Sequence, residues 1–326
     1  MVGLGGYTLG GGIGWLHRKL GLGCDNLASA EVVTADGAGL TASATENSDL
    51  LWALRGGGGN FGVATSLQYR LSPVNYVLAG LIFYPLDDLP KVAAFVRDYM
   101  AQAPDELGLW LLVRNAPALP ALPEEMHGRP VVAIALCYAD YDGAAGEVVG
   151  PVRRFGKPLI DLVKVRPYPE WQLALDGAWG NGFRNRWVGH YLSDLTDAAA
   201  QTLLEYVSKV PSPFTDTKLA TMGGAVARVG ENDTAVGFRD YKYALVIQAR
   251  WKVAEEDAAQ LAWTQDFFEA MRPHGTGKVQ VNFVADEGEA RVADAYNPLA
   301  LARLGAIKTK YDPHNLFRLN QNIWPS

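Results

Sequence analysis

The chain has few of the features that mark a stapled, membrane-spanning or nucleic-acid-binding protein. It has only two cysteines, Cys24 and Cys137, far apart in its 326 residues. A disulfide framework is therefore excluded, no metal site is expected, and a reducing cytoplasm suits the chain. No apolar run approaches the ~18 residues that a membrane span needs.

Basic clusters are also missing. The chain carries 29 Lys and Arg against 35 Asp and Glu, a formal net charge of −6, and no run of Lys and Arg. These charges argue against nucleic acid or an anionic membrane as partner. Because about half of the residues are hydrophobic, the chain can bury a large core and should form one large or two medium domains.

What the chain does have is glycine. In the stretch Arg55 to Val63, four successive glycines remove every Cβ from a turn, so its backbone can approach a bulky polar ligand closely. A short helix up to Leu54 and a strand from Val63 to Leu71 should flank this turn. The stretch satisfies G-x-G-x-x-G, but a dinucleotide-binding motif needs strand, turn and helix in that order. A nicotinamide site is thus excluded, and a turn without a ligand remains the alternative.

A second glycine cluster opens the chain, from Gly3 to Trp15, and a polar segment, Tyr311 to Ile323, closes it. Together with Ala30 to Gly37 and the Arg55 turn, these stretches resemble the bacterial FAD-linked oxidases of the berberine bridge enzyme-like and 6-hydroxy-D-nicotine oxidase family. The resemblance extends from Gly3 to the C-terminus and rests on several motifs in the same order.

The resemblance implies an α+β fold in three parts. Residues 1–75 would be the second half of a PCMH-type FAD-binding domain. Residues 76–275 would be a substrate domain with a large, mostly antiparallel sheet covered by helices, and residues 276–326 would return to the FAD site. The residue pattern itself alternates strands with amphipathic helices, which favours one broad sheet with helices on one face. Expected strands are 76–84, 107–114, 130–138, 185–192, 217–229, 243–251 and 279–284, and expected helices are 86–103, 143–155, 197–209 and 255–272.

The same resemblance implies an FAD-dependent oxidase that takes hydride from a small organic substrate and is reoxidised by molecular oxygen. Backbone N–H groups around seven residues would hold the cofactor, and amide side chains would add hydrogen bonds. In the family the C-terminal tail passes close to the flavin ring. The implied backbone positions are Gly5, Gly6, Tyr7, Gly11, Gly12, Gly62 and Val63, and the implied amides are Asn26, Asn282, Asn320 and Asn322.

Gln280 is the main departure from the family pattern within the implied site, because the family commonly has tyrosine at this position of the Gln280 to Phe283 motif. That tyrosine acts as base in several members, whereas a glutamine amide cannot accept a proton at neutral pH. Gln280 would then orient a substrate oxygen, and the catalytic base stays unassigned among Tyr168, His190, Tyr243 and a substrate that needs none. Gln172 matches a polar substrate contact of the family.

The family also has a preceding portion that carries the other half of the FAD site and the histidine that bonds to the flavin. None of the five histidines here lies in such a motif. This chain alone is therefore expected to bind FAD weakly or not at all. Three interpretations remain open: an FAD-dependent oxidoreductase, a degenerate binding or scaffold relative, and an incomplete gene product. Carbohydrate, alkaloid and polyketide substrates are equally compatible with the sequence.

Overall fold

The computed structural model of the chain describes residues 3–120, 122–140, 144–284, 287–319 and 321–326. It divides into two compact units. The sheet unit contains Val74–Met222 and Tyr241–Thr276. The terminal unit contains the segment that ends at Pro73 together with Gly223–Asp240 and Gly277–Ser326.

An eight-stranded sheet forms the centre of the sheet unit, and each of its described pairings is antiparallel. The strand order is β7-β4-β6-β5-β10-β11-β9, and β8 also pairs with β4. The α+β fold class with a large antiparallel sheet is therefore confirmed. The bounds are β4 Tyr76–Pro85, β5 Leu107–Asn115, β6 Pro130–Tyr138, β7 Ile160–Asp161, β8 Lys164–Pro167, β9 Arg184–Leu192, β10 Asp216–Thr221 and β11 Tyr243–Trp251.

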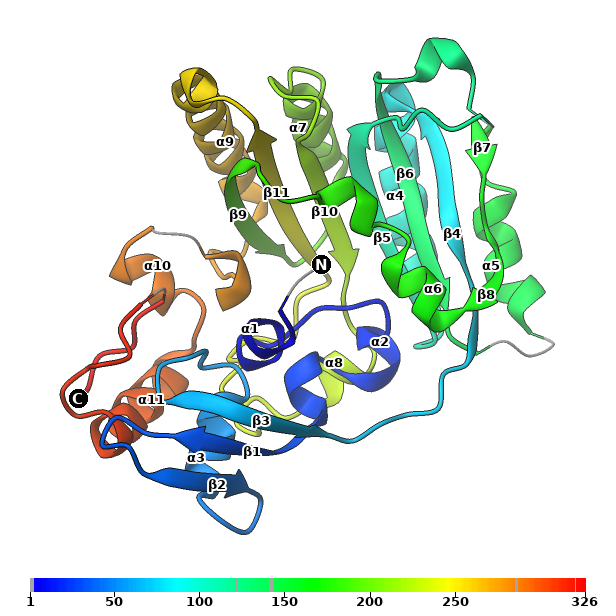
Figure 1. Cartoon of the computed structure of the whole chain (residues 1–326). Coiled ribbons are helices and arrows are strands. Elements are labelled where there is room, and N and C mark those ends of the chain that lie inside the picture. Colours follow the sequence, from blue (N-terminus) through cyan, green and yellow to red (C-terminus); the bar gives the residue numbers. More distant parts are fainter. Residues whose placement is uncertain (1–2, 121, 141–143, 285–286, 320) are drawn as a thin grey trace. The chain divides into compact units, whose positions relative to one another are not determined.

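Helices cover one face of this sheet (Figure 1). They are α4 (Leu89–Met100), α5 (Ala145–Arg153), α7 (Asp197–Val207) and α9 (Asp257–Met271). Their apolar side chains form one core cluster with alternate strand residues such as Leu109, Ile134 and Leu245. Since side chains alternate along a strand, the residues between these point to the opposite face, which is also buried along strands such as β6 and β11.

The terminal unit is built on a three-stranded antiparallel sheet in the order β2-β1-β3. Its strands are β1 Leu27–Val33, β2 Gly39–Ser43 and β3 Val63–Tyr69. The helices of the unit are α1 Leu4–Leu9, α2 His17–Leu20, α3 Ser48–Leu54, α8 Ala225–Arg228, α10 Glu289–Ala293 and α11 Pro298–Tyr311. Apolar residues of α3, α11 and the sheet share a second core cluster.

Residues 223–240 differ from the sequence-based division, which assigned them to the middle domain and placed 223–229 at the end of a strand from 217 to 229. The strand β10 ends at Thr221 instead, because Gly223 and Gly224 adopt positive φ angles of 92° and 59° and lead the chain out of the sheet. The segment joins the terminal unit through Arg239. Its guanidinium donates to both carboxylate oxygens of Asp25, at 3.0 and 2.7 Å.

The predicted strand from Val279 to Val284 is also wrong. Gln280 has extended backbone angles, but Val281–Phe283 forms a 3-10 turn in which the N–H of Phe283 donates to Gln280 O. Alternating apolar residues suggested a strand, and the valines are indeed buried in the second core cluster. The polar residues between them bond to backbone carbonyls of the N-terminal segment, so this segment does not depend on a strand partner.

A buried ion pair on α11 holds the C-terminal tail in place. The Lys308 ammonium donates to Asp312 Oδ2 at 2.6 Å, and both side chains are fully buried. It also donates to Asn60 O and Phe317 O, at 2.8 and 2.7 Å. Burial by itself would raise the pKa of Asp312, but the hydrogen bonds from Lys308, Leu316 and Phe317 lower it. The glycine turn and the tail therefore share one buried cation.

We expect Asp312→Asn to destabilise the protein strongly, because a buried ammonium loses its counter-charge. Breaking a buried pair costs about 3–5 kcal/mol, whereas an exposed pair contributes about 0–1 kcal/mol. Urea unfolding measures the difference. The matched control is Lys310→Met on the same helix, which removes the exposed pair with Asp49 and should change little.

The contribution of the Lys308–Asp312 pair to the free energy of unfolding should depend on pH, because the pKa of Asp312 is lowered in the folded protein. The stabilisation is present above the unfolded-state pKa, about 3.9, and is lost as the pH falls through the lower folded-state pKa. Equal unfolding free energies for Asp312→Asn and Lys310→Met would contradict this role of the pair.

Candidate functional site

Glycines near the N-terminus leave room for the ring of Tyr7. A Cβ atom at Gly12, Gly14 or Gly23 would lie 2.6 Å from an atom of the Tyr7 side chain. Tyr7 itself is in α1, where its N–H donates to Gly3 O at 3.1 Å. Much of this glycine cluster is thus explained by internal packing rather than by an open turn.

Gln280 and Asn282 contact the same N-terminal segment through an amide pair. Gln280 Nε2 donates to Asn282 Oδ1 at 2.8 Å and lies 3.4 Å from Gly10 O, and Asn282 Nδ2 donates to Gly6 O at 2.9 Å. A Cβ at Gly10 would lie 2.3 Å from Asn282 Nδ2, and one at Gly11 would lie 2.8 Å from Gln280 Nε2. Glycine at both positions therefore lets the amides reach the backbone.

Gln280 is the buried member of this pair. Its side chain is 3% exposed, and its Oε1 is buried without a hydrogen-bond partner among the described residues. An unpaired buried acceptor costs free energy unless a ligand or water supplies a donor. The side chains of Gln280 and Asn282 contact each other, and a turn, not the expected strand, positions them.

The other expected cofactor residues have mixed surroundings. A Cβ at Gly5 or Gly6 would meet no atom within 4 Å, so the backbone there is approachable. Gly62 has φ +156° and is packed on β1, where a Cβ would lie 2.5 Å from Val32 Cγ1. Val63 is 56% exposed. Asn26 uses its amide on Leu20 O and Leu22 O.

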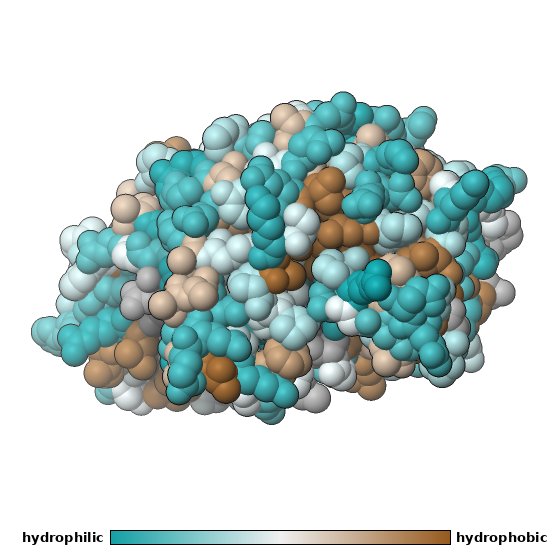
Figure 2. All heavy atoms as spheres, turned by 90° about the horizontal axis from the view of Figure 1, so that it is seen from above, coloured by the Kyte–Doolittle hydropathy of each residue, from teal (hydrophilic) through white to brown (hydrophobic). Residues whose placement is uncertain are grey.

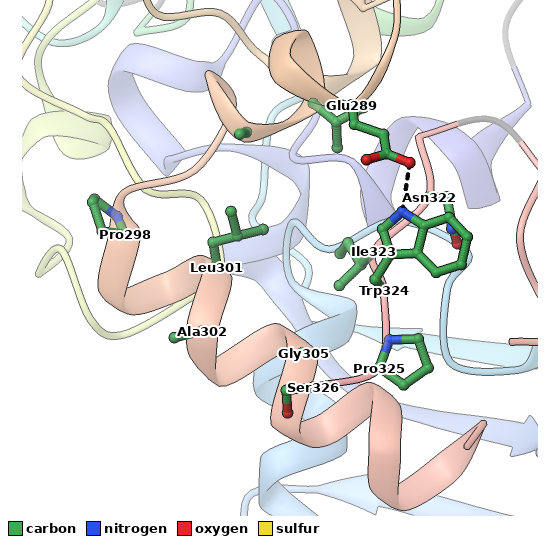
Figure 3. A pocket seen from close by; sticks show the side chains of 12 residues that line it. Glu289, Pro298, Leu301, Ala302, Gly305, Asn322, Ile323, Trp324, Pro325 and Ser326 are labelled. Carbon is green, nitrogen blue, oxygen red and sulfur yellow. Dashed lines mark hydrogen bonds between the residues drawn. The ribbon is translucent and has the colours of Figure 1, made fainter. Parts of the chain in front are cut away.

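The two asparagines of the tail are not found with the other expected cofactor residues. Asn320 lies outside the described residues. Asn322 lines a pocket of about 570 Å³ between α10, α11 and the tail, whose lining includes none of the other expected cofactor residues (Figure 3). At this pocket Trp324 Nε1 donates to Glu289 Oε1 at 2.9 Å. Asn322 Oδ1 is buried without a partner among the described residues.

In the sheet unit, polar side chains form a row across the sheet face opposite the helices. In the register of the strands Asp216 lies opposite Gln248, which lies opposite Trp187. Arg114 of β5 joins the row, with its Nε 3.5 Å from Asp216 Oδ1. Gln248 Oε1 and Trp187 Nε1 are both buried without a partner among the described residues. The row thus offers a buried acceptor and a buried donor on neighbouring strands.

Lys218 follows two residues after Asp216 on the same face of β10. Burial is the main cause that lowers its pKa to about 8, Asp216 opposes the shift, and Arg114 and Arg250 add to it. This residue is not among those predicted from the sequence. The signal was a lysine within a strand that is otherwise buried in the centre of the sheet.

Two of the three candidate bases lie on the wrong face. Tyr243 belongs to the core beneath the helices, and His190 stacks on Phe268 of α9 and contacts Phe268 O through Nε2 at 2.9 Å. Tyr168 begins α6 (Tyr168–Leu173), and its hydroxyl donates to Gln172 Oε1 at 3.0 Å. Because burial raises the pKa of Tyr168, its phenol is a poor base. Gln172 is exposed at this helix.

Little else on the described part of the chain suggests a different site. No three His, Cys, Asp or Glu residues gather there as metal ligands would, and no described helix is both long and apolar enough to cross a membrane. The face of the molecule in Figure 2 is mostly hydrophilic, with hydrophobic residues gathered near its middle.

We expect Gly10→Ala to destabilise the terminal unit, because Asn282 must give up its bond to Gly6 O to accommodate the methyl group. The lost hydrogen bond and the overpacking together should cost about 2 kcal/mol or more, measured by thermal and urea unfolding. The control is Gly5→Ala, which should stabilise the protein by about 0.5–1 kcal/mol, because Gly5 lies in a helix with open space beside it. Adding Asn282→Ala should relieve Gly10→Ala, and an unrelieved double variant would contradict the proposed clash.

Comparisons with known proteins agree with one another. The sequence model of the family "Berberine and berberine like" matches residues 281–324. An uncharacterized FAD-linked oxidoreductase of Bacillus subtilis, YvdP, is 30% identical over the whole chain, which covers 71% of that protein. The (R)-6-hydroxynicotine oxidase of Paenarthrobacter nicotinovorans is 29% identical over 99% of the chain and 71% of its own length.

Solved structures extend the likeness to the fold. The crystal structure of 6-hydroxy-D-nicotine oxidase from Arthrobacter nicotinovorans matches with a TM-score of 0.85 at 27% identity, covering all of this chain and 72% of that one. A berberine bridge enzyme-like protein of Physcomitrella patens matches with a TM-score of 0.84 at 21% identity, again over the whole chain and 71% of its own.

Proposed function

The chain belongs to the berberine bridge enzyme-like family of FAD-linked oxidoreductases, and we propose that its terminal unit contributes to the FAD site and its sheet unit to the substrate site of such an enzyme. The reaction is the oxidation of a CH–OH or CH–NH group of a small organic molecule, with molecular oxygen as the final electron acceptor. The observation that carries the proposal is the Gln280 and Asn282 amide pair beside Gly10 and Gly11, with its buried unpaired acceptor.

The residues of the terminal unit fit part of a flavin cofactor. The flavin ring has an imide N–H and carbonyl oxygens, and Gln280 Oε1 can accept from such an N–H. The backbone at Gly5 and Gly6 has open space beside it for a polar ligand. Gly11 and Gly12 make room for Gln280 and for the ring of Tyr7, Gly62 packs on Val32, and the Asn26 and Asn282 amides bond to backbone carbonyls, while Val63 is exposed. When bound, FAD supplies the two-electron acceptor that no amino acid provides.

Gln280 can orient a substrate or cofactor group but cannot remove a proton. The substrate proton must then leave by another group or by solvent. Of the three candidates, Tyr243 and His190 pack beneath the helices, and Tyr168 has a raised pKa. We therefore propose a substrate whose proton leaves without a dedicated tyrosine base, and a contact of that substrate with Gln172.

Location in the cytoplasm is part of the proposal. Cys24 and Cys137 are free and completely buried, which suits a reducing compartment. Burial also raises the pKa of both thiols, so neither acts as a nucleophile at neutral pH.

Adding FAD to the purified protein tests the function. We expect weak binding, seen as a change in flavin fluorescence, and bleaching of the visible flavin absorbance under anaerobic conditions by a member of a panel of small alcohols and amines. Air should restore the absorbance. FAD that binds and is bleached by dithionite but by no substrate would favour the alternative, a non-catalytic binding relative. An unchanged flavin signal at millimolar concentration would contradict the cofactor site.

The variant Gln280→Tyr tests the missing base. A phenol at this position can take the substrate proton, so we expect faster flavin reduction, by about tenfold or more on the scale of general base catalysis. Stopped-flow reduction with a bleaching substrate measures the rate. Gln280→Phe has the same ring without the hydroxyl and serves as the control. Equal rates for the Tyr and Phe variants would remove proton abstraction at residue 280 from the mechanism.

A further inference from the structure

The loop that leads into β9 contains Asn181 followed by Gly182, the one asparagine–glycine step in the sequence. Both residues are exposed and lie in bends, outside any helix or strand. Gly182 has φ +84°, and a Cβ atom there would meet nothing within 4 Å. The backbone nitrogen after Asn181 therefore has open space around it and no side chain of its own to shield it.

Contacts on both sides hold this loop and leave the step between them free. Arg250 Nη2 donates to Gly180 O at 2.9 Å, and the Arg250 guanidinium lies 4.3 Å from the centre of the Phe183 ring. Within the part of the chain that the structure describes, neither the Asn181 side chain nor the Gly182 N–H makes a hydrogen bond. The side-chain amide and the next backbone nitrogen are thus free to approach each other.

An asparagine side chain reacts with the backbone nitrogen that follows it when the two can meet. The Gly182 nitrogen attacks Asn181 Cγ, so the N–Cγ bond forms and the Cγ–Nδ2 bond breaks. Nδ2 leaves as ammonia and takes the proton of the Gly182 nitrogen, and a succinimide ring remains. Water then opens the ring at either carbonyl, which gives aspartate or isoaspartate. No oxidation or reduction takes place in either step.

We propose that Asn181 is a site of spontaneous deamidation in the folded protein, with water as the co-reactant. The inference is independent of the proposed function, because no flavin or substrate takes part. The product carboxylate arises two residues before Phe183, whose ring has the Lys252 ammonium 5.8 Å from its centre and the Arg250 guanidinium beside it. Nearby positive charges favour the ionised product.

Two other asparagines show how the fold prevents the same reaction. Asn185 is also exposed, but it lies within β9, opposite Arg250 of β11, and the residue after it continues the strand. Asn47 is followed by a serine, yet its Nδ2 donates to Thr41 O at 2.9 Å and the next residue begins α3. A ladder or a helix fixes the backbone nitrogen away from the side chain, so both residues serve as internal controls.

The test follows deamidation of the whole chain at mildly alkaline pH and physiological temperature by peptide mapping with mass spectrometry. A synthetic peptide of residues 176–187 is incubated beside it. We expect Asn181 in the protein to react within about tenfold of its rate in the peptide, and at least about tenfold faster than Asn185 or Asn47. Isoaspartate is identified by methyl transfer from S-adenosylmethionine with an isoaspartate-specific methyltransferase.

Asn181→Gln should abolish the isoaspartate, because the longer side chain closes an unfavourable larger ring. Asn185→Gln is the matched control on the same loop and strand, and it should leave the reaction unchanged. Circular dichroism and thermal unfolding check that each variant and the incubated protein are folded. A rate at Asn181 far below that of the peptide, a rate equal to that of Asn185, or aspartate formed without isoaspartate would overturn the inference.

Discussion

The terminal unit depends on a single ammonium group that water does not reach. Lys308 bonds to the carbonyl of Asn60, the carboxylate of Asp312 and the carbonyl of Phe317. Asn60 in turn donates to Gly57 O and Gln321 O and accepts from the N–H of Ile323. One cation and one amide thus join the glycine turn to a tail about 260 residues further along the chain. An apolar side chain at either position would leave several buried backbone groups unpaired.

Polar side chains also join separate stretches of the chain at two other points of the unit. The bidentate pair between Arg239 and Asp25 holds the segment that returns after β10, and the N–H of Leu22 also donates to Asp25. The Gln280 and Asn282 amides hold the segment that returns before α10. The unit is therefore assembled from three stretches of sequence that polar side chains join at specific contacts, most of them buried. Polar junctions of this kind favour one arrangement of the stretches over others more strongly than apolar contact does.

The sequence predicted the large sheet well and the junctions badly, for a physical reason. Strands such as 130–138 and 243–251 bury both faces, and helices such as α7 carry an apolar face, so local patterns identify them. The turn at Val281 has the same apolar alternation as a strand, and only its bonds to a segment 270 residues away distinguish it. The helical state of residues 4–9 was hidden in the same way, because glycine disfavours helices locally.

Site residues show the same division. Gln280 and Asn282 could be picked out from the sequence because they stand two residues apart in one short motif, and their side chains are in contact with each other and with the N-terminal segment. The glycines Gly12 and Gly62 are explained by close packing that no local pattern reveals. Lys218 was missed because its lowered pKa comes mainly from burial in the sheet, with smaller contributions from Arg114 and Arg250 on other strands. Strand order, which long-range pairing sets, decides which charges share a face.

The packing of Tyr7 has a consequence for how this region can change by mutation. One aromatic ring fills the space that Cβ atoms at Gly12, Gly14 and Gly23 would occupy. An alanine at any of these positions conflicts with the ring, whereas the same alanine beside a small residue at position 7 meets no ring there. The effects of substitutions at these four positions are therefore not additive. In sequence drift the three glycines and the tyrosine should be retained or replaced as a set.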